Sequence, residues 1–472
     1  MEIGIACFAV FLVMAALMYS RKISALLALP IMAVAIGLVG HIPADRILTD
    51  VLAKGSTKLA NAYTTTIFGA ILADLINRLG IAKALVRWVA EFAGDNPFLL
   101  SLLMTLVTAL LFSSLGGLGA VIMVGTVILP VMLSLGIMPL TAGGLFLFGI
   151  SLGGMFNLAN WQLYIDVLHL QQAQITAYIV PFAAVVAAAI LAFLLVELRA
   201  WSNLKWVGIG IAAIAVACIA HGGSFGAVAD ATNAAQTSAV PAVQTSIIGS
   251  GVILLLLIIW AVFRQRRRDR SLPGIAFLAP AVPLVLVLLW HWDIIPAFLA
   301  GTTYAVLSTW QRDSVNLLTR SIIEGTSTVA PAVVLMLGIG MLLAAVMDPA
   351  VSHAIAPLLA KMVPTHATGY VLVFSVLAPL ALYRGPLSLW GMGSGIVKLI
   401  QQSTALGGSA IMSMLMSVGQ LQGICDPTNT HNVWIATYLG TDTQALLKRT
   451  LPYAWCAVVG GLLLAVTLGY VR

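Results

Sequence analysis

A run of polar residues interrupts an apolar stretch close to the C-terminus, over Asp426-Pro427-Thr428-Asn429-Thr430-His431-Asn432. Proline lacks a backbone N–H, so a helix is expected to break here. The side chains that can offer oxygens to a small cation, or donors to the hydroxyls of a substrate, are those of Asp426, Thr428, Asn429, Thr430 and Asn432. His431 and Asp426 are candidate carriers of a coupled proton, because imidazole and carboxyl groups both exchange protons. The alternative for His431, a histidine that only packs in the core, stays open.

A second polar turn, Tyr383-Arg384-Gly385-Pro386-Leu387-Ser388, lies between two apolar runs. An arginine within a membrane costs about 2.5–3.5 kcal/mol, so its presence calls for a function. Its planar guanidinium fits a carboxylate with two parallel hydrogen bonds. We therefore predict that Arg384, with Gly385 and Ser388, binds a carboxylate of the substrate. In the alternative, the turn lies at the surface and the Arg384 side chain reaches water.

The first half of the chain contains a related turn, Ser113-Ser114-Leu115-Gly116-Gly117-Leu118-Gly119. Its bare amides, its two hydroxyls and the start of the next helix favour an anionic oxygen. The predicted binding residues in this half are Ser113, Ser114, Gly116, Gly117, Gly119, Asn157 and Asn160. The two asparagines lie beside Trp161 in the next apolar run. The alternative is a tight turn that uses glycine only for its backbone freedom.

Composition defines the elements that must position these residues. The chain is 61% hydrophobic and 8% charged, with a mean hydropathy of +1.06, which predicts an all-α polytopic membrane protein. A span needs about 20 apolar residues, and this template predicts about eleven spans and two re-entrant hairpins. The net charge of +7 comes mostly from basic residues at helix ends, so it does not indicate nucleic acid binding. The four cysteines show no paired spacing and are interpreted as core residues.

The predicted elements form two halves joined by a connecting segment. The first repeat, 1–200, has spans near 3–19, 23–40, 61–78, 139–171 (a broken helix) and 174–198, and a hairpin over 97–137. The connecting segment, 201–272, has spans near 204–221 and 247–263, an external linker over 222–246 and a cytoplasmic basic cluster at 264–270. The second repeat, 273–472, has spans near 274–290, 294–309, 321–347, 407–438 (a broken helix) and 450–470, and a hairpin over 368–402.

Matching segments relate the two halves. Lys54-Gly55-Ser56-Thr57 corresponds to Glu324-Gly325-Thr326-Ser327 at an offset of 270 residues, and the two turns correspond at the same offset. With both termini outside the cytoplasmic (inner) membrane, most Lys and Arg residues outside the hairpins face the cytoplasm. The halves then have opposite orientations, as in an inverted repeat. Residues 80–93 are expected to form an interfacial arm, and Asp74 is expected to pair with Arg78 at the i,i+4 spacing.

The chain resembles the ion transporter superfamily, most closely the citrate–divalent-metal:proton symporter family, with the gluconate permeases as cousins. The resemblance rests on Tyr19–Leu26, the Ser113–Gly119 hairpin with Leu129-Pro130, Phe156–Trp161, and the position of Asp426–Trp434. It implies an organic-anion symporter with an elevator motion and a homodimer as the unit. The family places acidic residues at its hairpin turns. Their absence here, and the arginine at the second turn, favour a free carboxylate over a metal–citrate complex.

These patterns predict a secondary active transporter, not an enzyme, that imports a small organic carboxylate by elevator-type cation symport. The proton is the expected coupling ion, with sodium as the alternative. The expected partners are the organic anion and membrane lipid, without nucleic acid, cofactor or metal centre, since no His, Cys or carboxylate spacing indicates one. A sodium/proton antiporter that uses Asp426 and His431 for ions alone is the main rival. A channel or a non-transporting membrane subunit is the third functional class considered.

Overall fold

The computed structural model describes residues 2–20, 22–203, 272–384, 387–390 and 393–471, and every regular element in these ranges is a helix. The elements of the first half are α1 (Glu2–Tyr19), α2 (Ala25–Val39), α3 (Ala44–Arg46), the π-helix η1 (Ile47–Lys54), α4 (Gly55–Thr57), α5 (Ala60–Arg78), α6 (Ile81–Ala93), α7 (Pro97–Phe112), α8 (Gly117–Ser134), α9 (Pro139–Met155), α10 (Leu158–Leu168), α11 (Gln172–Glu197) and the 3₁₀ turn η2 (Trp201–Asn203). The predicted spans 204–221 and 247–263, the linker 222–246 and the basic cluster 264–270 lie outside the described residues.

The second half follows a similar order. Its elements are the 3₁₀ turn η3 (Gly274–Leu278), α14 (Val282–Trp290), α15 (Ile294–Ser308), α16 (Ser314–Val346), α17 (Pro349–Met362), α18 (Ala367–Leu377), the 3₁₀ helix η4 (Ala378–Arg384), α19 (Gly393–Ser403), α20 (Gly408–Cys425), α21 (Thr430–Tyr438) and α22 (Thr443–Thr467). The succession from α16 to α22 repeats the succession from α5 to α11. In this order α17 corresponds to α6, a counterpart that the sequence analysis did not assign.

Several of these helices have the length and apolarity of membrane spans. Within the described ranges five helical stretches do so, and the bent pair α9 and α10 makes a sixth. Six shorter apolar helices of 10–17 residues accompany them. α5 begins at Ala60, close to the predicted start of one span near residue 61, and it continues a longer helical stretch, Ala44–Arg78 of 35 residues, whose first part was not predicted. The charged N-terminal part of this stretch is accommodated by ion pairs, including Arg46 with Asp50 and with Asp348.

A pair of close glycine contacts shows how the two halves are related. A Cβ built on Gly55 would lie 2.9 Å from the Cα of Met341 in α16, so the backbones nearly touch. A Cβ built on Gly325 would lie 3.0 Å from the Cα of Ile71 in α5. The offset of 270 residues relates Gly55 to Gly325 and Ile71 to Met341, so the two contacts are equivalent. The stretch that contains Gly55 and Ile71 therefore runs antiparallel to α16. Equivalent spans that cross antiparallel have opposite membrane orientations, which is the geometry of an inverted repeat.

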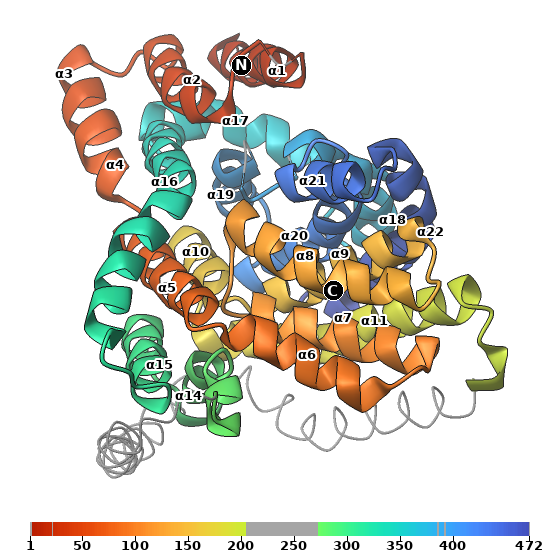
Figure 1. The fold of residues 1–472 in the computed structure, drawn as a ribbon. Helices are drawn as coiled ribbons and strands as arrows, with labels where there is room; N and C mark the ends of the chain where they lie inside the picture. Colours follow the sequence, from red (N-terminus) through yellow and green to blue (C-terminus); the bar gives the residue numbers. More distant parts are fainter. Residues whose placement is uncertain (1, 21, 204–271, 385–386, 391–392, 472) are drawn as a thin grey trace.

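The helices pack in two groups (Figure 1). We call the first the α5–α16 group: α16 packs on α5 and α2, and α15 packs on α5. The second, the broken-helix group, consists of α7, α9, α11, α20 and α22, with α8 against α9. The short helix α10 contacts both groups. Arg78 pairs with Asp74 as predicted and also with Glu324 of α16. The second ion pair joins α5 of the first repeat to α16 of the second.

Candidate functional site

The first helix break is closed by side chains that lie just beyond it. The carbonyls of the last turn of a helix lack partners within the helix. Here Asn160 Nδ2 donates to Gly154 O at 2.8 Å, and the buried indole Nε1 of Trp161 donates to Met155 O at 2.6 Å. These bonds satisfy the end of α9 and hold α10 at a bend of 51°. The break is therefore a defined structural feature.

Asn157 connects this break to the first hairpin turn. Its Oδ1 caps α10 by accepting from Ala159 N at 3.1 Å. Its Nδ2 donates to Phe112 O, in the last residue of α7, at 3.2 Å and to Leu115 O, in the hairpin turn, at 3.0 Å. Since the side chain is 9% exposed and its amide is engaged at both ends, we assign Asn157 a positioning role rather than direct contact with a ligand.

The two serines of the hairpin turn are also engaged internally. Ser113 Oγ donates to Leu110 O at 2.7 Å, and Ser114 Oγ donates to Pro280 O at 2.5 Å. Their hydroxyl hydrogens are therefore committed to carbonyls. The predicted glycines Gly116, Gly117 and Gly119 are exposed, and a Cβ on any of them would meet no atom within 4 Å. The amides at the start of α8 are what this turn offers to an anion.

The second break repeats the same construction with different residues. Asp426, fully buried at the end of α20, accepts from the backbone N and the hydroxyl of Thr428 at 2.9 and 2.6 Å. His431 Nε2 lies 3.2 Å from Gly423 O and 3.2 Å from Asn429 Nδ2. As in the first half, side chains beyond the break fold back onto the end of the preceding helix.

Asn432 contains an unsatisfied buried acceptor. Its Nδ2 donates to Ile424 O at 3.0 Å, but its buried Oδ1 has no hydrogen-bond partner among the described residues. The side chain is 3% exposed. A buried amide oxygen without a donor costs about 1–3 kcal/mol, and a cation or a ligand hydroxyl would remove that cost.

Three side chains that the sequence analysis did not assign link the breaks to one another. Ser151 Oγ of α9 donates to Gln420 Oε1 of α20 at 2.7 Å. The predicted residue Ser388 donates to Gln422 Oε1 at 2.8 Å. The available signal was the pair of glutamines in the apolar run before the second break. The bond to Gln422 places the predicted residue Ser388 beside α20, the helix that leads to the second break.

The helices that carry this network leave room beside it. A Cβ on Gly419 of α20 would meet no atom within 4 Å, and one on Gly154 of α9 would meet only Asn160 Nδ2 at 4.0 Å. Both glycines are partly exposed, as are Gln422 and Gly423. Gln420 and Ser388 of the network are themselves buried, so the open space lies beside the network.

Part of the predicted anion clamp remains a prediction. η4 ends at Arg384, so the backbone before the second turn is 3₁₀-helical. The side chain of Arg384 and all of Gly385 lie outside the described residues.

A polar contact set holds the far end of α10. Asp166 Oδ2 accepts from Ala62 N at the start of α5 at 3.0 Å, and Gln401 Nε2 of α19 donates to Leu168 O at 3.2 Å. These bonds join α5 and α19 to α10. Burial, together with the cations of Lys398 and Lys58, lowers the pKa of His169, which follows α10.

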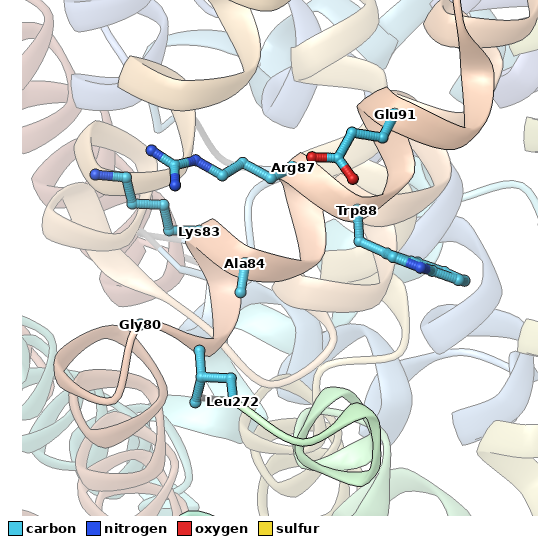
Figure 2. A pocket seen from close by; sticks show the side chains of 7 residues that line it. All are labelled: Gly80, Lys83, Ala84, Arg87, Trp88, Glu91 and Leu272. Atoms are coloured by element: carbon cyan, nitrogen blue, oxygen red, sulfur yellow. The ribbon is translucent and has the colours of Figure 1, made fainter. Parts of the chain in front are cut away.

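A pocket lies elsewhere, beside α6, on residues that belong to neither break (Figure 2). It is therefore treated separately from the site between the broken helices.

Comparison with known proteins identifies a structural relative. No family model matches the chain, and no curated protein matches its sequence. The structure is similar to the crystal structure of the Alcanivorax borkumensis YdaH transporter, which is described as having an unusual topology. The TM-score is 0.56 at 16% identity, and the match covers 94% of this chain and 97% of that one. At this identity the likeness shows the fold. It does not single out the citrate–metal symporter family. The chain has the fold of a multi-pass helical membrane protein.

Proposed function

We propose that this protein is a secondary active transporter that imports a small organic carboxylate by cation symport, with the proton as the coupling ion. The observation that supports it most is a pair of hydrogen bonds to α20, the helix before the second break. Ser151 of α9, the helix before the first break, donates to Gln420, and Ser388 of the second hairpin turn donates to Gln422. Broken helices that face each other in an inverted repeat are the usual frame of a carrier's substrate site. The fold shared with a transporter agrees with this proposal.

In the proposed site, the amides at the start of α8 hold one end of the anion and Arg384 holds a carboxylate. Substrate hydroxyls would be contacted by the amide groups of Asn160 and Asn429 and by the hydroxyl oxygens of Thr428 and Ser388, which can still accept while they donate to Asp426 and Gln422. Asp426 or His431 carries the proton. The two helix groups would move relative to each other about α10 in an elevator-type step. A homodimer in the cytoplasmic membrane is the proposed unit.

The proposal is tested by uptake of radiolabelled citrate, tricarballylate, gluconate and lactate into proteoliposomes, under an imposed pH or sodium gradient. One acid should accumulate, and Gln420→Leu should abolish its accumulation. Thr437→Val is the matched control, because the Thr437 hydroxyl is exposed and bonds only within its own helix. Accumulation of all four acids at the level of empty liposomes, under both gradients, would contradict the proposal for this substrate class.

The second candidate is a sodium/proton antiporter, and the unsatisfied Oδ1 of Asn432 beside the second break favours it. Oxygen ligands suit a small hard cation, and Asp426 supplies a carboxylate close by in sequence. The two functions differ in their requirement for an organic acid. An antiporter dissipates a pH gradient when sodium is added to acid-free proteoliposomes, whereas the proposed symporter does not.

A further inference from the structure

A cavity of about 310 Å³ opens beside α6 and has a mixed lining (Figure 2). Two cations, Lys83 and Arg87, line it together with Trp88, the carboxylate of Glu91 and the apolar side chain of Leu272. Neither break contributes to this cavity, so the candidate transport site does not account for it.

The helix that carries the cavity is strongly amphipathic. Its buried face, which includes Ile81, Leu85 and Val89, packs against the neighbouring helices. Its other face leaves two large aromatic rings uncovered: Trp88 is 57% exposed and Phe92 is 70% exposed. The two rings stack with centroids 6.4 Å apart. Exposed aromatic rings beside cations on an amphipathic helix are typical of a helix that lies in the headgroup region of a bilayer.

The two cations of the cavity outnumber the one carboxylate, Glu91, that lines it with them. Lys83 and Arg87 lie at the i,i+4 spacing, and Figure 2 shows their side chains extending from α6 in the same direction. Within the described part of the chain neither forms an ion pair, whereas the nearby Arg78 pairs with both Asp74 and Glu324. An anion that enters the cavity would therefore meet two cations against the single carboxylate of Glu91.

We propose that this cavity binds the phosphate of an anionic phospholipid headgroup. Lys83 and Arg87 would contact the phosphate oxygens, and the guanidinium can do so with two hydrogen bonds. Glu91 at the rim would accept a hydrogen bond from a headgroup hydroxyl. Trp88, Phe92 and Leu272 would lie along the glycerol and the start of the acyl chains. The exposed aromatic rings are the reason to assign the phosphate to a lipid rather than to free phosphate, which has no apolar part for them to contact.

The test measures binding of phosphatidylglycerol to the purified full-length protein by native mass spectrometry, with phosphatidylcholine as the comparison lipid. The variant is Lys83→Gln with Arg87→Gln. The matched control is Arg312→Gln with Lys448→Gln, which removes the same charge from two exposed positions at other predicted cytoplasmic ends. Each cation near a lipid headgroup contributes about fivefold in affinity, so the cavity variant should bind phosphatidylglycerol about thirty-fold more weakly. The control should bind it like the unmodified protein.

Two results would overturn the proposal. Equal weakening in the cavity variant and the control would show a general response to charge. Full protection of the protein against heating by inorganic phosphate alone, lost in the cavity variant, would assign the cavity to a free anion. Neither measurement requires transport, so the outcome is independent of the proposed function. Circular dichroism of the cavity variant checks that it remains folded.

Discussion

The strongest structural prediction concerns Asn157, whose side chain joins the first helix break to the first hairpin turn. Asn157→Ala removes the cap of α10, which contributes about 1 kcal/mol. It also removes the donor from Phe112 O and Leu115 O, two acceptors at a buried position, at about 1–3 kcal/mol each. We expect the free energy of unfolding to fall by about 3 kcal/mol or more. Asn157→Asp keeps the cap but faces the same two oxygens with a carboxylate, so it should be at least as harmful.

The assay is thermal unfolding of the purified variants in one detergent, followed by tryptophan fluorescence, together with uptake. Asn160→Ala is the matched control, because it removes one hydrogen bond from the same break and should cost about 1 kcal/mol. The Tm of Asn157→Ala should fall well below that of Asn160→Ala. Equal shifts for the two variants, or an Asn157→Asp protein as stable as the unmodified one, would refute the assignment of Asn157 as the link between break and turn.

Three further predictions concern the site and the fold. Arg384→Ala should abolish uptake while expression and the gel-filtration profile stay normal; uptake with unchanged affinity would remove the anion clamp. Asn432→Ala should abolish any stabilisation of the protein by sodium, and a sodium-dependent Tm that survives the substitution would show that its Oδ1 binds no cation. Gly325→Ala should destabilise the protein by about 1–3 kcal/mol, because the new Cβ would lie 2.8 Å from a backbone oxygen of α5. Gly419→Ala is the control: its new Cβ would have open space around it, so the Tm should stay unchanged or rise. A larger fall in Tm for Gly419→Ala than for Gly325→Ala would contradict the close crossing of α5 and α16.

The breaks were predictable because their signals are local. Pro427 cannot continue the hydrogen bonding of a helix, and the glycines around Gly117 allow its left-handed conformation, with φ +80°. Pro97 and Pro139 mark the starts of α7 and α9, where the predicted hairpin and broken helix also begin. Proline is favoured in the first turn of a helix, so these boundaries follow from residue type alone.

The partners across the breaks were not predictable. An apolar run in a membrane protein is hydrophobic on all sides, so its sequence does not show which face of α20 meets α9. Ser151 and Gln420 are therefore found only from the packing. The serines of the first turn illustrate the same limit: their type suits an anion, but in the fold their hydroxyls bond to carbonyls. The helix α17 was missed because its 14 residues are fewer than the about 20 that the span template requires, and because Pro357 lies inside it.

The central claim is that the two breaks form one site for an organic acid. The most direct measurement is the thermal stability of the purified protein against mono-, di- and tricarboxylates at two pH values, with and without sodium. A ligand at 100 times its Kd stabilises a protein by about 2.7 kcal/mol. The account predicts a shift with one acid that depends on pH and disappears in Gln420→Leu. A shift with sodium or pH alone, and none with any acid, would contradict it and favour the antiporter.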